Sequence, residues 1–176
     1  LRPYESQNST FSTAMQHTIS VLVSNKFGVL SRISGLFSGR GFNIESLNVA
    51  ETNDPNISRM TIVTRGDEQK VEQITKQLNK LVDIIKVVDL TEENFIDREM
   101  VLIKMNAETK NREEILRIVG IFRAKVVDVS SSTYTIEITG DQGKLKGIME
   151  LLRPLGIKEV VRSGRIALSR GMKSIN

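Results

Sequence analysis

NKFGVLSRISGLFSGRGFNIE, residues 25–45, is the most informative part of the sequence about the fold, because it joins a strand to a helix and the helix to a second strand. Residues 17–24 precede it and alternate in the manner of a strand. One face takes Ile19, Val21 and Val23, and the other takes Thr18, Ser20 and Leu22. The stretch itself carries an apolar stripe at helical spacing: Val29, Leu30, Ile33, Leu36 and Phe37. The glycines of residues 39–41 end that helix.

Gly28 lies where the strand passes into the helix N-terminus. Free backbone N–H groups and the positive end of the helix dipole can hold a small anion there, and a glycine leaves those donors uncovered. Asn43, just past the helix, adds one donor and one acceptor. The segment has neither phosphate-binding glycine motif, so a carboxylate is the favoured anion. The alternative is that Gly28 only forms a tight turn and Asn43 only caps one.

Size and composition limit the function classes. A chain of 176 residues, 39% of them hydrophobic, forms one domain or two small ones. The absence of cysteine excludes disulfides, thiolate metal sites and a thiol nucleophile. The apolar runs are too short for a membrane span, so we expect a soluble protein. The Ser- and Thr-rich residues 1–14 are expected to be disordered, as a cloning remnant or the end of a transit peptide, and stand outside the fold.

Basic residues concentrate near the C-terminus. The formal net charge is +4, and residues 151–176 hold six Lys and Arg against Glu159 alone. Nucleic acid, an acidic partner surface and plain solvent exposure all fit such a tail. The chain has no Trp and few aromatic residues, which disfavours a stacking platform for nucleic acid.

The pattern predicts the same small plan twice. A hairpin is predicted from residue 43 to 64, after the first helix. A second helix then begins at Gly66 and Asp67, with an apolar stripe that continues to Leu81 and Val82, and a strand follows over 83–90. The second copy is expected as strand 98–105, helix 111–122, hairpin 125–139, a helix opening at Gly140 and Asp141, and strand 157–168. This predicts an α+β protein of two ferredoxin-like βαββαβ modules. The expected organisation is a disordered segment over 1–14, modules over 15–91 and 98–172, and a linker over 92–97.

The copies differ where the anion site is predicted. The second has no glycine at its strand-to-helix junction, and Glu113 and Glu114 in the first helical turn would repel a carboxylate. The first module should therefore carry the site. Its exposed sheet edge favours side-by-side dimerisation, in which the Gly28 loop of one chain faces the Asn43 strand of the other.

Catalytic motifs are missing. His17 is the only histidine, and a lone histidine at a strand start is most often structural. The acidic pairs at 92–93 and 113–114 fall in a linker and at a helix start, and no G-x-S-x-G elbow is present. We therefore do not expect this chain to be an enzyme by itself, and we expect no metal site.

The ordered motifs resemble a known family. A similarity to the regulatory small subunit of acetolactate synthase, also called acetohydroxyacid synthase, is carried by six stretches: the run from His17 to Asn48, SRMTIV at 58–63, EQITKQLNKLV at 72–82, REMVLIK at 98–104, IFRAKVVDV at 121–129 and RSGRIALSRG at 162–171. The resemblance covers nearly the whole chain, from Met15 to Gly171.

The resemblance implies an N-terminal ACT domain, a C-terminal ACT-like domain and a homodimer. It implies activation and valine feedback inhibition of a separate catalytic subunit in branched-chain amino acid biosynthesis. This chain would hold no cofactor, and thiamine diphosphate, Mg²⁺ and FAD would belong to the catalytic subunit. It would work in a bacterial cytoplasm or a plastid stroma. The implied effector-binding residues are Asn25, Gly28, Val29, Leu30, Asn43, Ile44 and Ala50.

Two other function classes stay open. One is a free-standing amino-acid-sensing regulator that binds nucleic acid through the basic tail, although no helix-turn-helix segment is left over after the modules are assigned. The other is an enzyme in its own right, which the missing catalytic motifs disfavour.

Overall fold

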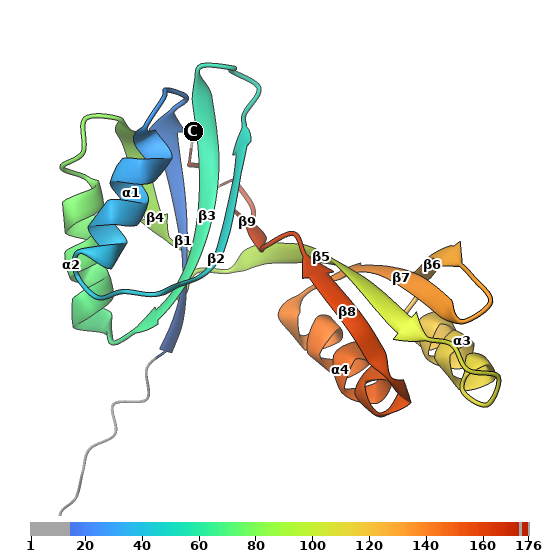
Figure 1. Ribbon diagram of the computed structural model, residues 1–176. Coiled ribbons are helices and arrows are strands. Elements are labelled where there is room, and N and C mark those ends of the chain that lie inside the picture. The colour runs from blue at the N-terminus through green and yellow to red at the C-terminus, as the bar shows by residue number, and fades with distance from the viewer. Residues whose placement is uncertain (1–14, 173, 176) are drawn as a thin grey trace, which may run out of the picture.

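The computed structural model describes residues 15–172 and 174–175, and it has two α+β modules joined by one long strand (Figure 1). The first module consists of β1 (Met15–Ser24), α1 (Val29–Ser38), β2 (Ile44–Glu51), β3 (Ile57–Gly66), α2 (Glu68–Leu78) and β4 (Ile84–Asp89). Its sheet is antiparallel with the order β2-β3-β1-β4, so β2 and β4 are the edges. Residues 1–14, which we expected to be disordered, lie outside the described part.

The second module repeats the plan, with the sheet order β6-β7-β5-β8. Its elements are β5 (Phe95–Asn106), α3 (Arg112–Ile121), β6 (Lys125–Val129), β7 (Thr133–Gly140), α4 (Gln142–Leu152), β8 (Ile157–Arg162) and β9 (Ile166–Ser169). The predicted class, α+β with two βαββαβ modules, is confirmed. The second helix of each module begins alike: Asp67 and Asp141 accept hydrogen bonds of 2.8 Å from the backbone N–H of Lys70 and Lys144.

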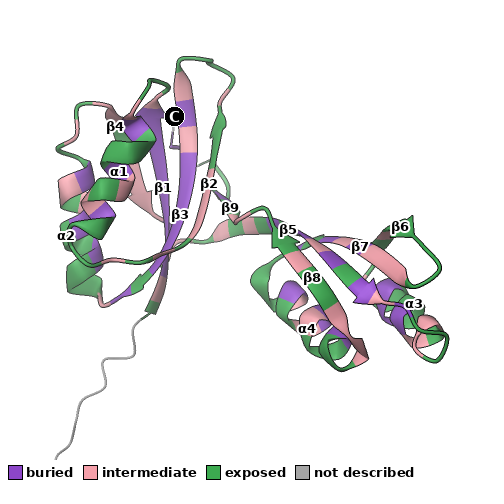
Figure 2. Cartoon of the chain, in the orientation of Figure 1, coloured by how far each residue is buried: buried purple, intermediate pink, exposed green. Residues whose placement is uncertain are grey.

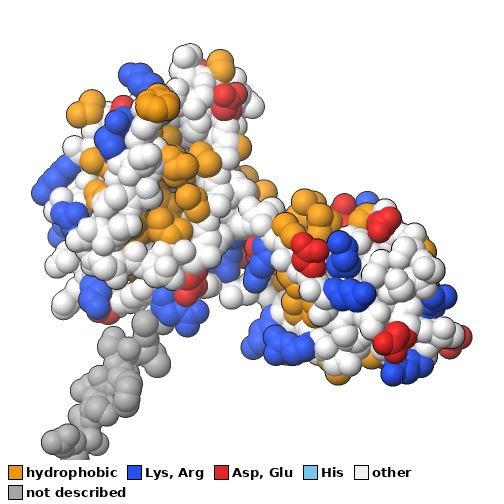
Figure 3. All heavy atoms as spheres, viewed as in Figure 1, with side chains coloured by type: hydrophobic (Ala, Val, Ile, Leu, Met, Phe, Trp, Pro, Cys, Tyr) orange, Lys and Arg blue, Asp and Glu red, His pale blue; other side chains and the backbone are white. Residues whose placement is uncertain are grey.

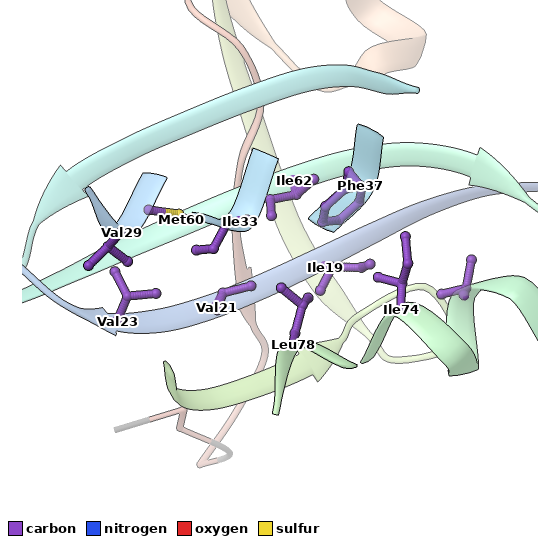
Figure 4. Close-up of a cluster of buried hydrophobic side chains, with 11 residues drawn as sticks. Ile19, Val21, Val23, Val29, Ile33, Phe37, Met60, Ile62, Ile74 and Leu78 are labelled. Atoms are coloured by element: carbon purple, nitrogen blue, oxygen red, sulfur yellow. The ribbon is translucent and has the colours of Figure 1, made fainter. Parts of the chain in front are cut away.

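Each module has its own hydrophobic core between its sheet and its two helices. In the first, the apolar face of β1 meets Ile33 and Phe37 of α1 and Ile74 of α2, all almost fully buried (Figure 4). Phe37 and Phe42 make an edge-to-face contact with ring centroids 6.4 Å apart. The helical and strand periodicities of the sequence therefore predict which faces are buried.

Both faces of β1 are buried, although only one is apolar throughout residues 19–23 (Figure 2). Thr18, Ser20 and Leu22 face away from α1 and α2, yet they are at most 4% exposed. The cause is β9, which lies against β1 on the helix-free face of the first sheet. Sequence periodicity indicates only which residues share a face of a strand, so it does not reveal that β9 covers the second face of β1.

Three boundaries differ from the expected ones. The strand expected over 157–168 is two strands, β8 and β9, separated by Ser163–Arg165. The helix expected to reach Val82 ends at Leu78, and Val82 is 98% exposed. Within the expected linker of 92–97, β5 begins at Phe95, because residues 95–98 pair with β9. For the two strand boundaries, the reason is that pairing with a distant segment fixes where a strand begins or ends, and local propensity does not encode that pairing.

Candidate functional site

Gly28 has the backbone that the predicted anion site requires. It is the N-cap of α1 in the left-handed conformation, with φ +81° and ψ −5°. No side chain caps this helix, and its first turn has no acidic residue. The other described α-helices differ: Asp67 and Asp141 cap α2 and α4, and Glu113 and Glu114 occupy the first turn of α3. The Val29 N–H donates a long, 3.4 Å hydrogen bond to the Lys26 carbonyl, so the next amides of the first turn, such as that of Leu30, are the ones left for an external anion.

Arg32 adds a positive charge that sequence reasoning missed. A Cβ on Gly28 would lie 3.2 Å from Arg32 Nη1, so the guanidinium folds back beside the helix N-terminus. Arg32 Nη2 donates a 2.5 Å hydrogen bond to Asp83 Oδ2 in the turn before β4, which holds the guanidinium in that place. The available signal was the spacing, since a residue four positions after the N-cap lies one helical turn above it.

Asn25 ties the Gly28 loop to the hairpin between β2 and β3. Its Nδ2 donates hydrogen bonds of 2.9 Å to Glu51 Oε1 and to the Pro55 carbonyl, and its backbone N–H donates to the Asn56 carbonyl at 2.7 Å. The loop next to Gly28 is therefore fixed against the C-terminal end of β2. The neighbouring Phe27 side chain is fully exposed and takes no part in this arrangement.

Asn43 and Ile44 lie at the opposite end of α1 from Gly28. The helix has ten residues, which at 1.5 Å per residue separates its ends by about 15 Å. The Asn43 carbonyl accepts a 2.7 Å hydrogen bond from Thr64 Oγ1, and Ile44 packs partly against the core. One chain therefore brings Asn25, Gly28, Val29 and Leu30 together and leaves Asn43 and Ile44 apart from them.

Ala50 lies on the helix-free face of β2, whereas the residue before it faces α1. Val49 pairs with the buried Met60 and alternates with Leu47 on the helix side, and Ala50 pairs with Arg59. Val49 and Leu30 are each 42% exposed. Figure 3 shows hydrophobic side chains gathered between α1 and β2, the elements that carry the partly buried Leu36, Ile44 and Leu47. The strict alternation of side chains along the strand could have shown that Val49, and not Ala50, lies on the helix side of β2.

A groove of about 870 Å³ lies on the helix-free side of the first sheet, away from Gly28. Ala50 lines it, together with apolar residues of β5 and β9 such as Ile96, Ile166 and Leu168, and with Ile175 near the C-terminus. The groove and the α1 N-terminus are therefore separate features of the molecule.

The described residues offer little for catalysis. His17 is 3% exposed, and its Nδ1 lies 3.2 Å from Asp89 Oδ2, which is the structural placement that we expected. Within residues 15–172 and 174–175, no three His, Cys, Asp or Glu side chains gather as metal ligands would. No helix among the described residues has the length and apolar character needed to cross a membrane.

Two arginines of the basic C-terminal region are engaged in ion pairs. Arg162 pairs with the buried Glu99 through both Nε and Nη2, and Arg165 Nε lies 3.4 Å from Asp97 Oδ2. The hydrogen bonds to Glu99 raise the pKa of Arg162 above its ordinary value. These two charges serve the fold, so the basic tail offers less to a nucleic acid than its composition indicates.

Comparisons with known proteins agree with this geometry. Residues 19–86 match the family described as "AHAS small subunit-like ACT domain", and residues 98–171 match "Small subunit of acetolactate synthase". The chain belongs to the acetolactate synthase small-subunit family. The resemblance noted from the sequence motifs is thereby confirmed.

Relatives in this family align with nearly the whole chain. A probable acetolactate synthase small subunit of Archaeoglobus fulgidus is 52% identical, over 90% of this chain and 99% of its own length. The acetolactate synthase small subunit of Aquifex aeolicus is 51% identical, over 89% and 82%. The crystal structure of the Thermotoga maritima small subunit superposes with a TM-score of 0.81 at 41% identity, over 89% of this chain and 98% of that one. The family relationship therefore includes both modules.

Proposed function

We propose that this protein is the regulatory subunit of an acetolactate synthase, which activates a separate catalytic subunit and makes it sensitive to valine. The observation that carries the proposal is the uncapped, acid-free N-terminus of α1 at Gly28, in a chain that belongs to the small-subunit family. A free amino acid has a carboxylate for those amides and an aliphatic side chain for the apolar border between α1 and β2. Chemistry on pyruvate stays with the catalytic subunit and its thiamine diphosphate, Mg²⁺ and FAD.

A homodimer through β2 would complete the site. β2 is an edge strand, and an antiparallel pair of β2 strands around a two-fold axis would place Ile44 of one chain opposite Glu51 of the other. Because Asn25 is hydrogen-bonded to Glu51, the second copy's Asn43 would then come to the Gly28 loop of the first. The two groups of predicted residues, separated by α1 within one chain, would meet across this interface. Leu30 and Val49, each half-exposed, would contact the effector side chain there.

The regulation would be a linkage effect. The complex would exist in a more active and a less active arrangement. Valine can shift the equilibrium between them only by the difference between its binding free energies for the two arrangements. Such coupling free energies are typically about 1–3 kcal/mol, a 5- to 150-fold change in affinity.

Reconstitution tests the proposal. The purified chain is mixed with an acetolactate synthase catalytic subunit, and acetolactate formation from pyruvate is measured with and without valine. We expect the rate to rise when the chain is added and to fall as valine is titrated. Calorimetry should show one valine per Gly28 loop, and sedimentation should show a dimer. A chain that neither changes the rate nor binds valine, leucine or isoleucine would refute the proposal.

A further inference from the structure

The segment between β8 and β9, Ser163–Arg165, rests directly on the outer face of β2. Asn48 Nδ2 donates a 3.3 Å hydrogen bond to the Ser163 carbonyl, and the Arg165 backbone N–H donates a 3.0 Å bond to Ser46 Oγ. Ser163–Arg165 of the second module thus lie along residues 46–48 of β2, the strand at which the effector is proposed to bind. In Figure 1 this connection lies between the two modules, where β8 continues into β9.

Gly164 makes this contact closer than side chains with a Cβ ordinarily come to their neighbours. Its φ is +80°, and an added Cβ would lie 3.1 Å from the Leu47 carbonyl oxygen and 3.2 Å from Ser46 Oγ. Both the positive φ and the tight space strongly favour glycine at this position. Because no free space separates β2 from Gly164, a displacement of β2 is passed directly to Gly164.

The Arg165 side chain joins the same place to three other parts of the molecule. Its guanidinium donates to Thr18 Oγ1 and Gln16 Oε1 of β1, both at 3.1 Å, and to Gln142 Oε1 at the start of α4, at 2.9 Å. Its Nε lies 3.4 Å from Asp97 Oδ2 of β5, and the side chain is only 12% exposed. A buried guanidinium with partners on both modules keeps them in one relative position.

We propose that Ser163–Arg165, which we name the β2 contact, transmits the effector state of the first module to the second. This inference rests on the proposed function, because β2 is the strand at which valine would be held between two chains. When two β2 edges close on valine, the β2 contact moves with residues 46–48 and re-orients the second module. The second module then changes the response of the catalytic subunit. Valine binding and the response to valine are thereby separable.

The test substitution is Gly164→Ala, with Gly171→Ala as its matched control. Gly171 also has a positive φ, +71°, but an added Cβ there would meet nothing within 4 Å. In the reconstituted complex we expect Gly164→Ala to keep valine affinity within about threefold and to keep activation. Its inhibition at saturating valine should fall to less than half of the wild-type extent. Gly171→Ala should match the wild type in all three measurements.

The outcomes distinguish this inference from the proposed function. If wild-type protein neither binds valine nor responds to it, the proposed function fails. If the wild type is inhibited and folded Gly164→Ala is inhibited to the same extent, only the β2 contact is refuted. Loss of activation together with inhibition also refutes it, because the contact would then be needed for assembly rather than for transmission.

A second variant covers the case in which Gly164→Ala does not fold. Ser46→Ala combined with Asn48→Ala removes both side-chain hydrogen bonds to the segment without altering any backbone conformation. It should give the same separation of binding from inhibition. A merely structural role would lower the unfolding midpoint and leave the maximal inhibition unchanged.

Discussion

Gly28→Asp tests the effector site most directly. The new carboxylate would stand at the N-terminus of α1, next to the Arg32 guanidinium, whose Nη1 lies 3.2 Å from the position of an added Cβ. Its oxygens would accept hydrogen bonds from the backbone N–H groups of the first turn, which are the donors that the effector carboxylate needs. Two carboxylates about 4 Å apart repel by about 4 kcal/mol at an effective dielectric constant of about 20. If the partly exposed loop retains half of this, valine binding weakens by about 2 kcal/mol, roughly 30-fold.

The assay is valine inhibition of the reconstituted enzyme, with calorimetry of the isolated chain beside it. We expect the concentration of valine for half-inhibition to rise at least 30-fold while activation without valine is kept. Gly171→Asp is the control, because it places the same residue at another positive φ in open space. Undiminished inhibition of the Gly28→Asp complex would show that the effector carboxylate does not bind at this helix.

Three further predictions concern stability and activity. Phe37→Ala, at a fully buried side chain, should lower the free energy of unfolding by about 3–5 kcal/mol, whereas Phe27→Ala, fully exposed, should change it by less than about 0.5 kcal/mol; urea denaturation compares them. The hydrogen bond from Gln16, with help from Arg65, lowers the pKa of Glu45, so its ionised form contributes stability above the unfolded pKa of about 4.5, and this contribution is lost as pH falls through the lower folded value. In acid titrations followed by circular dichroism, the free energy of unfolding of Glu45→Gln should therefore decrease less below pH 4.5 than that of the wild type, with a difference of up to about 1 kcal/mol. The same pH dependence in both proteins would contradict this. The isolated chain with pyruvate, thiamine diphosphate and Mg²⁺ should form no acetolactate, and measurable turnover would overturn its assignment as non-catalytic.

The site was only partly readable in the sequence. Gly28 was predicted to lie at the N-terminus of the first helix, because a glycine between an alternating strand and a helical stripe has a direct structural meaning. Arg32 was missed, because its importance depends on how the side chain folds back toward Asp83. Ala50 was placed in the site by resemblance, yet it faces the groove, and Val49 on the other face of β2 is the better candidate.

The amino-acid sequence alone predicted the two modules, their order of strands and helices, the apolar faces and a glycine at the N-terminus of the first helix. These features follow from periods of 2 and 3.6 residues and from the φ values that glycine permits. The folded chain was needed to show that the strand expected over 157–168 divides at Ser163–Arg165 and that its second part covers β1. The reason is that such a contact joins residues more than a hundred positions apart, and local periodicity carries no information about which distant surface will lie against a given face.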